Sequence, residues 1–216
     1  MNLLQRGPWR FCGEDALEIE KRKQTFRTPR KGVPRQPCVS PATELHCALL
    51  MSVIDEVLVA NEVYSRTHEL RRLTPRPERK LAILTCMDTR LSIRTLGLKT
   101  GDAHIIRNAG GIVTDDSLRS LLVSHYLLGT EEFMIINHTD CGLMHATEQE
   151  LRNRIQNLAG TAAIAPAFFF AFQNIEENVR HQLQKLRTHP WIPKKVAARG
   201  FVYDVTTGLL REVKDS

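Results

Sequence analysis

The chain has 216 residues, of which 42% are hydrophobic and 25% are charged, and its formal net charge is +6. This length and composition are typical of about one globular domain. The longest apolar run, residues 164–172, is interrupted by Pro166 and is far shorter than the roughly 20 residues of a membrane-spanning helix, so we expect no membrane association.

The N-terminus carries most of the positive charge. Residues 1–47 hold nine Lys and Arg against five Asp and Glu, which leaves a net charge of only +2 for the other 169 residues. Four prolines between residues 29 and 41 prevent a helix or strand from running through that stretch. We expect residues 1–50 to be a basic, proline-containing tail, either disordered or a start-site extension, and residues 51–216 to form the domain. The tail contains no recognisable nucleic-acid module, so we expect no nucleic-acid partner.

Hydrophobic patterning predicts alternating helices and strands in the domain. Short apolar runs are typical of buried parallel strands, and apolar residues three or four apart indicate amphipathic helices. The expected elements, in chain order, are a helix over 53–64, strands over 81–86 and 103–106, a helix over 115–128, a strand over 133–136, a helix over 168–187, a strand over 200–205 and a last segment over 209–213. This alternation predicts an α/β fold with a largely parallel β-sheet flanked by helices.

Three segments at the expected strand ends carry polar residues. They are Cys86-Met-Asp88-Thr-Arg90, Arg107-Asn-Ala-Gly-Gly111 and His138-Thr-Asp-Cys141-Gly142. The carboxyl ends of parallel strands are where α/β proteins bind ligands, so these segments could converge on one site. We expect Asn108 and Asp140 to orient their loops through local bonds to the backbone, as these residue types do in turns.

The cysteines suggest a metal site rather than disulfides. Five cysteines spread over a chain of this length indicate a reducing compartment, and we therefore expect a cytoplasmic protein. His138 and Cys141 can reach one metal ion from a single turn, and Cys86 can complete a set of three. Two thiolates and one imidazole suit zinc, and three protein ligands leave a fourth position open, as in catalytic zinc sites. The cysteines of the tail, Cys12, Cys38 and Cys47, receive no role.

These linked motifs resemble those of the β-class carbonic anhydrases, with the shorter bacterial members most similar, over about residues 51–215. The resemblance implies Zn²⁺ held by Cys86, His138 and Cys141, a catalytic Asp88–Arg90 dyad beside it, and a homodimer as the minimal unit. It also implies reversible hydration of CO₂ to bicarbonate and a proton, by attack of zinc-bound hydroxide. In some family members the aspartate is thought to close the metal site, so Asp88 is also a candidate zinc ligand.

Two other functions remain open at this point. The same zinc chemistry could hydrolyse carbonyl sulfide or carbon disulfide, and the width and lining of the pocket would decide between these substrates. Alternatively, the domain could be a non-catalytic zinc module in which Asp88 permanently closes the metal. The sequence singles out no proton shuttle, and both His104 and buffer are candidates.

Overall fold

The computed structural model describes residues 52–67, 72–162 and 166–214. The expected tail, residues 1–50, lies outside the described residues. The chain divides into two compact units, Met1–His68 and Glu69–Ser216. Within the described residues, no helix has the length and apolar character needed to cross a membrane.

Helix α3, Val53–Ser65, is the described part of the first unit, and it confirms the helix expected over 53–64. A capping box starts this helix, because the Ser52 hydroxyl accepts from the Asp55 N–H while the Asp55 carboxylate accepts from the Ser52 N–H. All residues of α3 are exposed, including Val53 and Ile54, whose exposed fractions are 73% and 72%.

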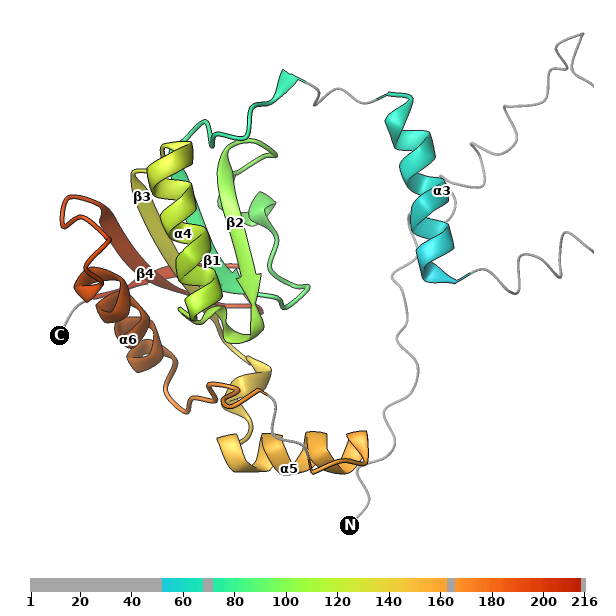
Figure 1. The fold of residues 1–216 in the computed structure, drawn as a ribbon, viewed down its shortest axis with the longest axis vertical. Coiled ribbons are helices and arrows are strands. Elements are labelled where there is room, and N and C mark those ends of the chain that lie inside the picture. The colour runs from blue at the N-terminus through green and yellow to red at the C-terminus, as the bar shows by residue number, and fades with distance from the viewer. Residues whose placement is uncertain (1–51, 68–71, 163–165, 215–216) are drawn as a thin grey trace, which may run out of the picture. The chain divides into compact units, whose positions relative to one another are not determined.

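The second unit is built on a sheet of five strands, counted over the described residues, in the order β2-β1-β3-β4-β5 (Figure 1). The strands are β1 Leu81–Cys86, β2 Ala103–Asn108, β3 Glu132–His138, β4 Ala197–Tyr203 and β5 Leu210–Val213. The first four pair in parallel, and β5 runs antiparallel to β4. The predicted largely parallel α/β fold is confirmed, and it places the carboxyl ends of β1 and β3 side by side.

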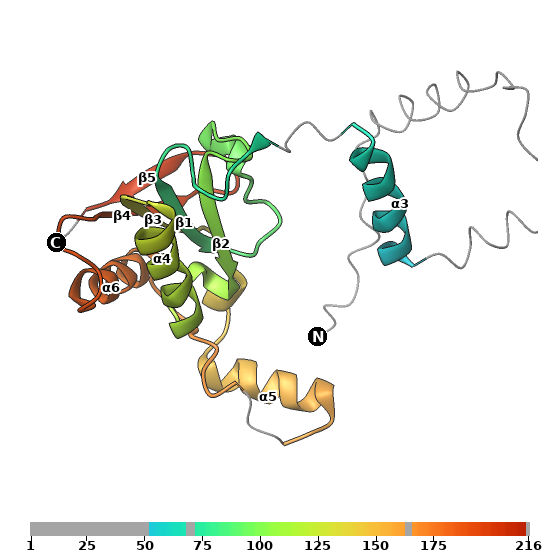
Figure 2. The same cartoon turned by 45° about the horizontal axis from the view of Figure 1, so that its top comes forward.

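Helices α4, Asp115–Leu128, and α6, Ile175–Thr188, cover one face of the sheet (Figures 1 and 2). Because side chains alternate along a strand, successive residues of β1 face opposite ways. Ala82 and Leu84 pack with the helices, whereas Ile83 belongs to a separate apolar cluster that also contains Cys86 and Cys141. The cysteines therefore lie in apolar surroundings at the end of the sheet.

The helix expected over residues 168–187 is wrong at its start. Helix α6 begins at Ile175 because the Asn174 side chain caps it, accepting from two backbone N–H groups of the first turn. Ahead of this cap, the N–H groups of Phe169 and Ala171 donate to the Glu148 carboxylate instead of to helical carbonyls. The phenylalanine-rich segment is therefore held in a non-helical path.

Glu148 opens helix α5, Glu148–Ala159, which is not among the expected elements. The sequence does carry helical signals here, since Leu151, Ile155 and Leu158 are spaced four and three apart and a capping box joins Thr147 to Glu150, yet the helix buries none of its side chains. In both views α5 projects away from the sheet (Figures 1 and 2). The strand expected over 200–205 is also displaced: β4 ends at Tyr203, because the Asp204 carboxylate accepts two backbone N–H groups and closes a turn.

Gly200 of β4 allows α6 to approach the sheet closely. A Cβ atom at this position would lie 2.3 Å from Val179 Cγ1 and 2.9 Å from Leu183 Cδ1. We predict that Gly200→Ala overpacks this contact and lowers the free energy of unfolding by about 1–3 kcal/mol, measured by urea denaturation. Gly142→Ala is the matched control, because a Cβ there meets no atom within 4 Å. Equal stability of Gly200→Ala and the parent protein would contradict this account of the packing.

Candidate metal centre

Cys86, His138 and Cys141 come together at the carboxyl ends of β1 and β3. The two sulfur atoms and a ring nitrogen of His138 all lie within 4.8 Å of one another, and all three residues are buried. Cys86 is the last residue of β1 and His138 the last of β3, and these strands are parallel neighbours. The structure thus brings together three of the four residues that the sequence suggested for a metal ion.

A tight turn returns Cys141 toward His138. The Thr139 N–H donates to the Tyr203 carbonyl at 2.9 Å, which ties the start of the turn to β4. Asp140 follows with φ +56°, a left-handed conformation that aspartate tolerates better than most residues. The Met144 N–H then donates to the Cys141 carbonyl at 2.9 Å, so both ends of the turn are held.

The imidazole of His138 is oriented as a metal ligand would be. Its Nδ1 lies 2.9 Å from the Thr139 carbonyl, and since a carbonyl only accepts, the proton must be on Nδ1. In the neutral ring, Nε2 therefore presents a lone pair. Among the described residues, it is the buried side-chain nitrogen or oxygen that has no hydrogen-bond partner. Leaving a buried polar atom unpaired costs free energy, so this geometry fits a bound cation.

The two sulfur atoms form one coupled acid. Hydrogen bonding with the Cys141 thiol lowers the pKa of Cys86 to about 4, and the same interaction raises the pKa of Cys141. Burial lowers the pKa of His138, but the interactions with Cys86, the Thr139 backbone and Asp88 together leave that pKa above its ordinary value. Negative charge therefore collects on Cys86 and attracts a proton. A soft divalent cation can replace that proton, because thiolates are metal ligands and thiols are not.

The loop after β2 supports Cys86. The Gly110 N–H donates to Cys86 Sγ at 3.4 Å, and the Arg107 side chain donates to the carbonyls of Cys86 and Asp88. Asn108 closes the loop by bonding both the N–H and the carbonyl of Ile112, which confirms its expected local role. The sequence singled out this segment but gave Arg107 no function, because its bonds reach across to another strand.

Asp88 lies beside the cluster, with Oδ2 at 3.9 Å from His138 Nε2. The Arg90 guanidinium holds both of its oxygens, with distances of 3.0 Å from Nε to Oδ1 and 2.8 Å from Nη2 to Oδ2. The backbone N–H of Arg90 adds a bond of 2.9 Å to Oδ1. These hydrogen bonds from Arg90 lower the pKa of Asp88 to about 2, so the carboxylate is charged at neutral pH.

Arg90 is itself fixed by a second acid. Its Nη1 donates to the Asp140 carboxylate at 2.8 Å, and His145 Nε2 lies 3.0 Å from the other Asp140 oxygen. The expectation that Asp140 makes a local backbone bond is therefore not what the structure shows. His104 has no free ring nitrogen for proton transfer, since one contacts Ser124 Oγ and the other the Pro75 carbonyl.

Comparison with known proteins gives a consistent result. A family model described as carbonic anhydrase matches residues 81–210. β-Carbonic anhydrase 1 of Mycobacterium tuberculosis is 41% identical over 165 residues, which cover 76% of this chain and 99% of that protein. Carbon disulfide hydrolase of Saccharolobus solfataricus is 36% identical over 189 residues, which cover 76% of this chain and 90% of that protein. The crystal structure of carbonic anhydrase from Streptococcus mutans aligns with a TM-score of 0.72 and 42% identity, over 76% of this chain and 99% of that one.

The fold and the cluster define an α/β protein with a buried Cys-His-Cys site suited to a soft metal ion. The family model and the relatives that match identify the family: the chain belongs to the β-class carbonic anhydrases. The resemblance in the sequence motifs is thereby confirmed. Since carbon disulfide hydrolases are also among the relatives, membership of the family leaves the choice of substrate to the site.

Proposed function

We propose that this protein is a cytoplasmic, zinc-dependent carbonic anhydrase that reversibly hydrates CO₂ to bicarbonate and a proton. The observation that carries the proposal is the buried Cys86–His138–Cys141 cluster, in which His138 Nε2 has no partner among the described residues. The relatives from M. tuberculosis and S. mutans are named as carbonic anhydrases, which supports this activity. Free thiols at Cys86 and Cys141 fit a reducing compartment such as the cytoplasm.

Cys86, His138 and Cys141 would hold the Zn²⁺, since two thiolates and an imidazole are a donor set that zinc accepts. Bound zinc supplies the Lewis acidity that activates water near neutral pH. The apolar cluster around the two cysteines limits the access of bulk water and strengthens charge interactions within the site.

Asp88 is the proposed catalytic residue. As an ionised carboxylate it accepts the hydrogen bond of the attacking water and directs its lone pair toward CO₂. Arg90 keeps Asp88 charged and fixes its plane through a bidentate pair, the strongest common form of such a bond. Asp140 restrains Arg90 from the far side. For Asp88 to become a zinc ligand, it would have to give up bonds to Arg90, and this favours an open site.

Carbon disulfide hydrolysis is the second candidate function. Two observations support it: carbon disulfide hydrolases are 36% identical to this chain, and the same donor cluster could serve that reaction. A non-catalytic zinc module, with Asp88 closing the metal, is the third candidate. Assays on both substrates with zinc-loaded protein separate these three candidates.

Removal of one sulfur should remove the metal. We expect the parent protein to carry about one zinc per chain and Cys86→Ser to carry little, because a soft thiolate is replaced by a hydroxyl. Zinc is measured by elemental analysis after extensive dialysis. Cys47→Ser is the matched control, since Cys47 has no assigned role. Full zinc occupancy of Cys86→Ser would show that the assignment of the ligands is wrong.

Removal of the Asp88 charge should separate metal binding from turnover. We expect Asp88→Asn to retain its zinc and to lose CO₂ hydration by about 10–100-fold or more, because an amide is a poor acceptor for the water proton. Stopped-flow assays compare CO₂ with carbon disulfide at equal enzyme concentration. If the parent protein turns over carbon disulfide but not CO₂, the second candidate is favoured. If the parent protein binds zinc but is inactive on both substrates, the non-catalytic module is favoured.

We also propose that the protein is a homodimer. Helix α3 exposes Val57 and Leu58 at 60% and 62%, and α4 exposes Leu127 at 67%. Exposed apolar surfaces of this kind commonly mark contacts between proteins, and a second copy of the chain would cover them. Sedimentation equilibrium should give twice the mass of one chain, and Leu58→Asp should weaken the dimer. A monomer at micromolar concentration would contradict this proposal.

A further inference from the structure

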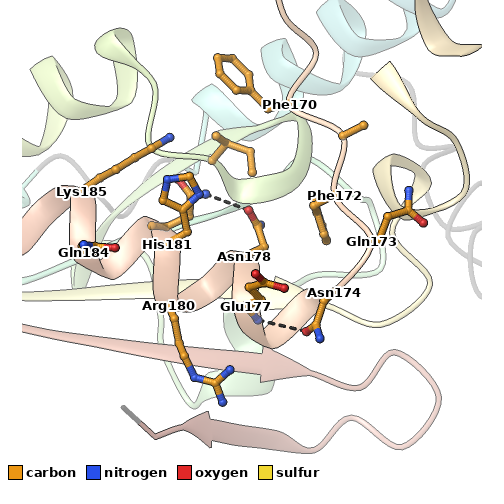
Figure 3. Close-up of a pocket in the computed structure, with 13 residues that line it drawn as sticks. Phe170, Phe172, Gln173, Asn174, Glu177, Asn178, Arg180, His181, Gln184 and Lys185 are labelled. Atoms are coloured by element: carbon orange, nitrogen blue, oxygen red, sulfur yellow. Dashed lines mark hydrogen bonds between the residues drawn. The ribbon is translucent and has the colours of Figure 1, made fainter. Parts of the chain in front are cut away.

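Three buried side-chain amides connect α6 to the loop beneath Cys86. Gln182 Nε2 donates to Asn178 Oδ1, Asn178 Nδ2 donates to Asn137 Oδ1, and Asn137 Nδ2 donates to the Gly110 carbonyl, each at 2.8 Å. Gln182 Oε1 accepts from the Val113 N–H at 2.9 Å, which closes the connection onto the same loop. Figure 3 shows Asn178 on α6 with its hydrogen bond. We call Asn137, Asn178 and Gln182 the amide relay.

The amide relay lies in the interior. The exposed fractions of Asn137, Asn178 and Gln182 are 1%, 8% and 2%. Burying an amide is unfavourable unless its hydrogen bonds are satisfied, so apolar side chains would fill this space at a lower cost. Every amide N–H of the relay that bonds a neighbour points from α6 toward Gly110, and aligned bonds of this kind reinforce one another. The relay is thus built to hold the loop in one orientation.

Gly110 of this loop contacts the sulfur atom of Cys86. Gly110 has φ +81°, and a Cβ there would lie 2.7 Å from Leu143 Cδ1, so the backbone conformation depends on glycine. Asn137 fixes the Gly110 carbonyl, while the Gly110 N–H donates to Cys86 Sγ at 3.4 Å. One residue therefore joins the relay to the sulfur.

We propose that Asn137, Asn178 and Gln182 are positioning residues that act through Gly110 on Cys86 and set how strongly its sulfur binds the metal ion. This inference rests on the proposed function, in which Cys86 is a zinc ligand. An N–H donor draws electron density from a thiolate and holds it in place, and such outer partners change metal affinity by about 10–100-fold. Through the amide relay, residues of α6 would also affect how strongly Cys86 binds the metal ion.

The test replaces relay amides with apolar side chains of similar size. In Asn178→Leu, we expect the dissociation constant for zinc to rise by about 10–100-fold, measured by competition with a chromophoric chelator. In the cobalt-substituted protein, the sulfur-to-cobalt charge-transfer band should move to lower energy, because the sulfur loses part of its hydrogen bond. Gln182→Met removes the bonds of Gln182 to Asn178 and to the Val113 N–H but keeps the bond between Asn178 and Asn137, so it should give smaller changes in the same direction.

Two variants on α6 provide controls. Leu183→Ala removes a buried apolar side chain that takes no part in the relay, so it should lower the melting temperature without moving the cobalt band. Gln184→Leu changes an exposed amide on the same helix and should alter neither property. A merely structural role for Asn178 would make Asn178→Leu behave like Leu183→Ala.

The outcomes separate the relay from the metal site itself. If the parent protein binds no zinc, the proposed function fails and the relay proposal fails with it. If the parent binds zinc, and Gln182→Met and folded Asn178→Leu both bind it within about twofold with unchanged cobalt spectra, only the relay proposal is overturned. If Asn178→Leu does not fold, Gln182→Met decides the question, since it leaves the bond between Asn178 and Asn137 in place.

Discussion

The parallel pairing of β1 with β3 is the constraint on which the site depends. It brings the last residues of both strands, Cys86 and His138, to the same edge of the sheet. A one-residue slip in register would send alternate side chains to the wrong face and separate the donors. The apolar residues that fill both faces of the sheet therefore also fix the distances among the sulfur and nitrogen atoms.

Around that edge, charge is arranged in layers. The sulfur pair and His138 form an electron-rich centre, Asp88 adds a carboxylate beside it, and Arg90 supplies the compensating positive charge. Asp140 then holds Arg90 from outside. Because each group is bound to the next, the carboxylate beside the cluster is fixed in direction as well as in charge, which is what pre-organised catalysis requires.

Much of this architecture was predictable from the sequence, and the misses have physical causes. Short apolar runs predicted β1 and β3. The spacing of His138 and Cys141 predicted the turn between these two residues. Local patterns do not encode contacts between distant residues, so the bond from Arg90 to Asp140, 50 positions away, was missed. Helix α5 was missed although the spacing of Leu151, Ile155 and Leu158 and the capping box at Thr147 indicate a helix. The relay amides were missed because Asn137 lies on β3 and Asn178 and Gln182 lie on α6, and local sequence patterns do not encode bonds between distant elements.

The order of the elements along the chain has a consequence for synthesis on the ribosome. Cys86 lies on β1, Gly110 in the loop after β2, His138 at the end of β3 and Cys141 in the turn that follows, so all four leave the ribosome before α6. The sheet neighbours that set the donor spacing can therefore pair while the C-terminal residues are still being made. Asn178 and Gln182 arrive later, together with the strand that packs against their helix. A chain truncated ahead of α6 would hold every donor and the bond from Asn137 to Gly110, but it would lack Asn178 and Gln182, which hold Asn137 and the Val113 N–H in place.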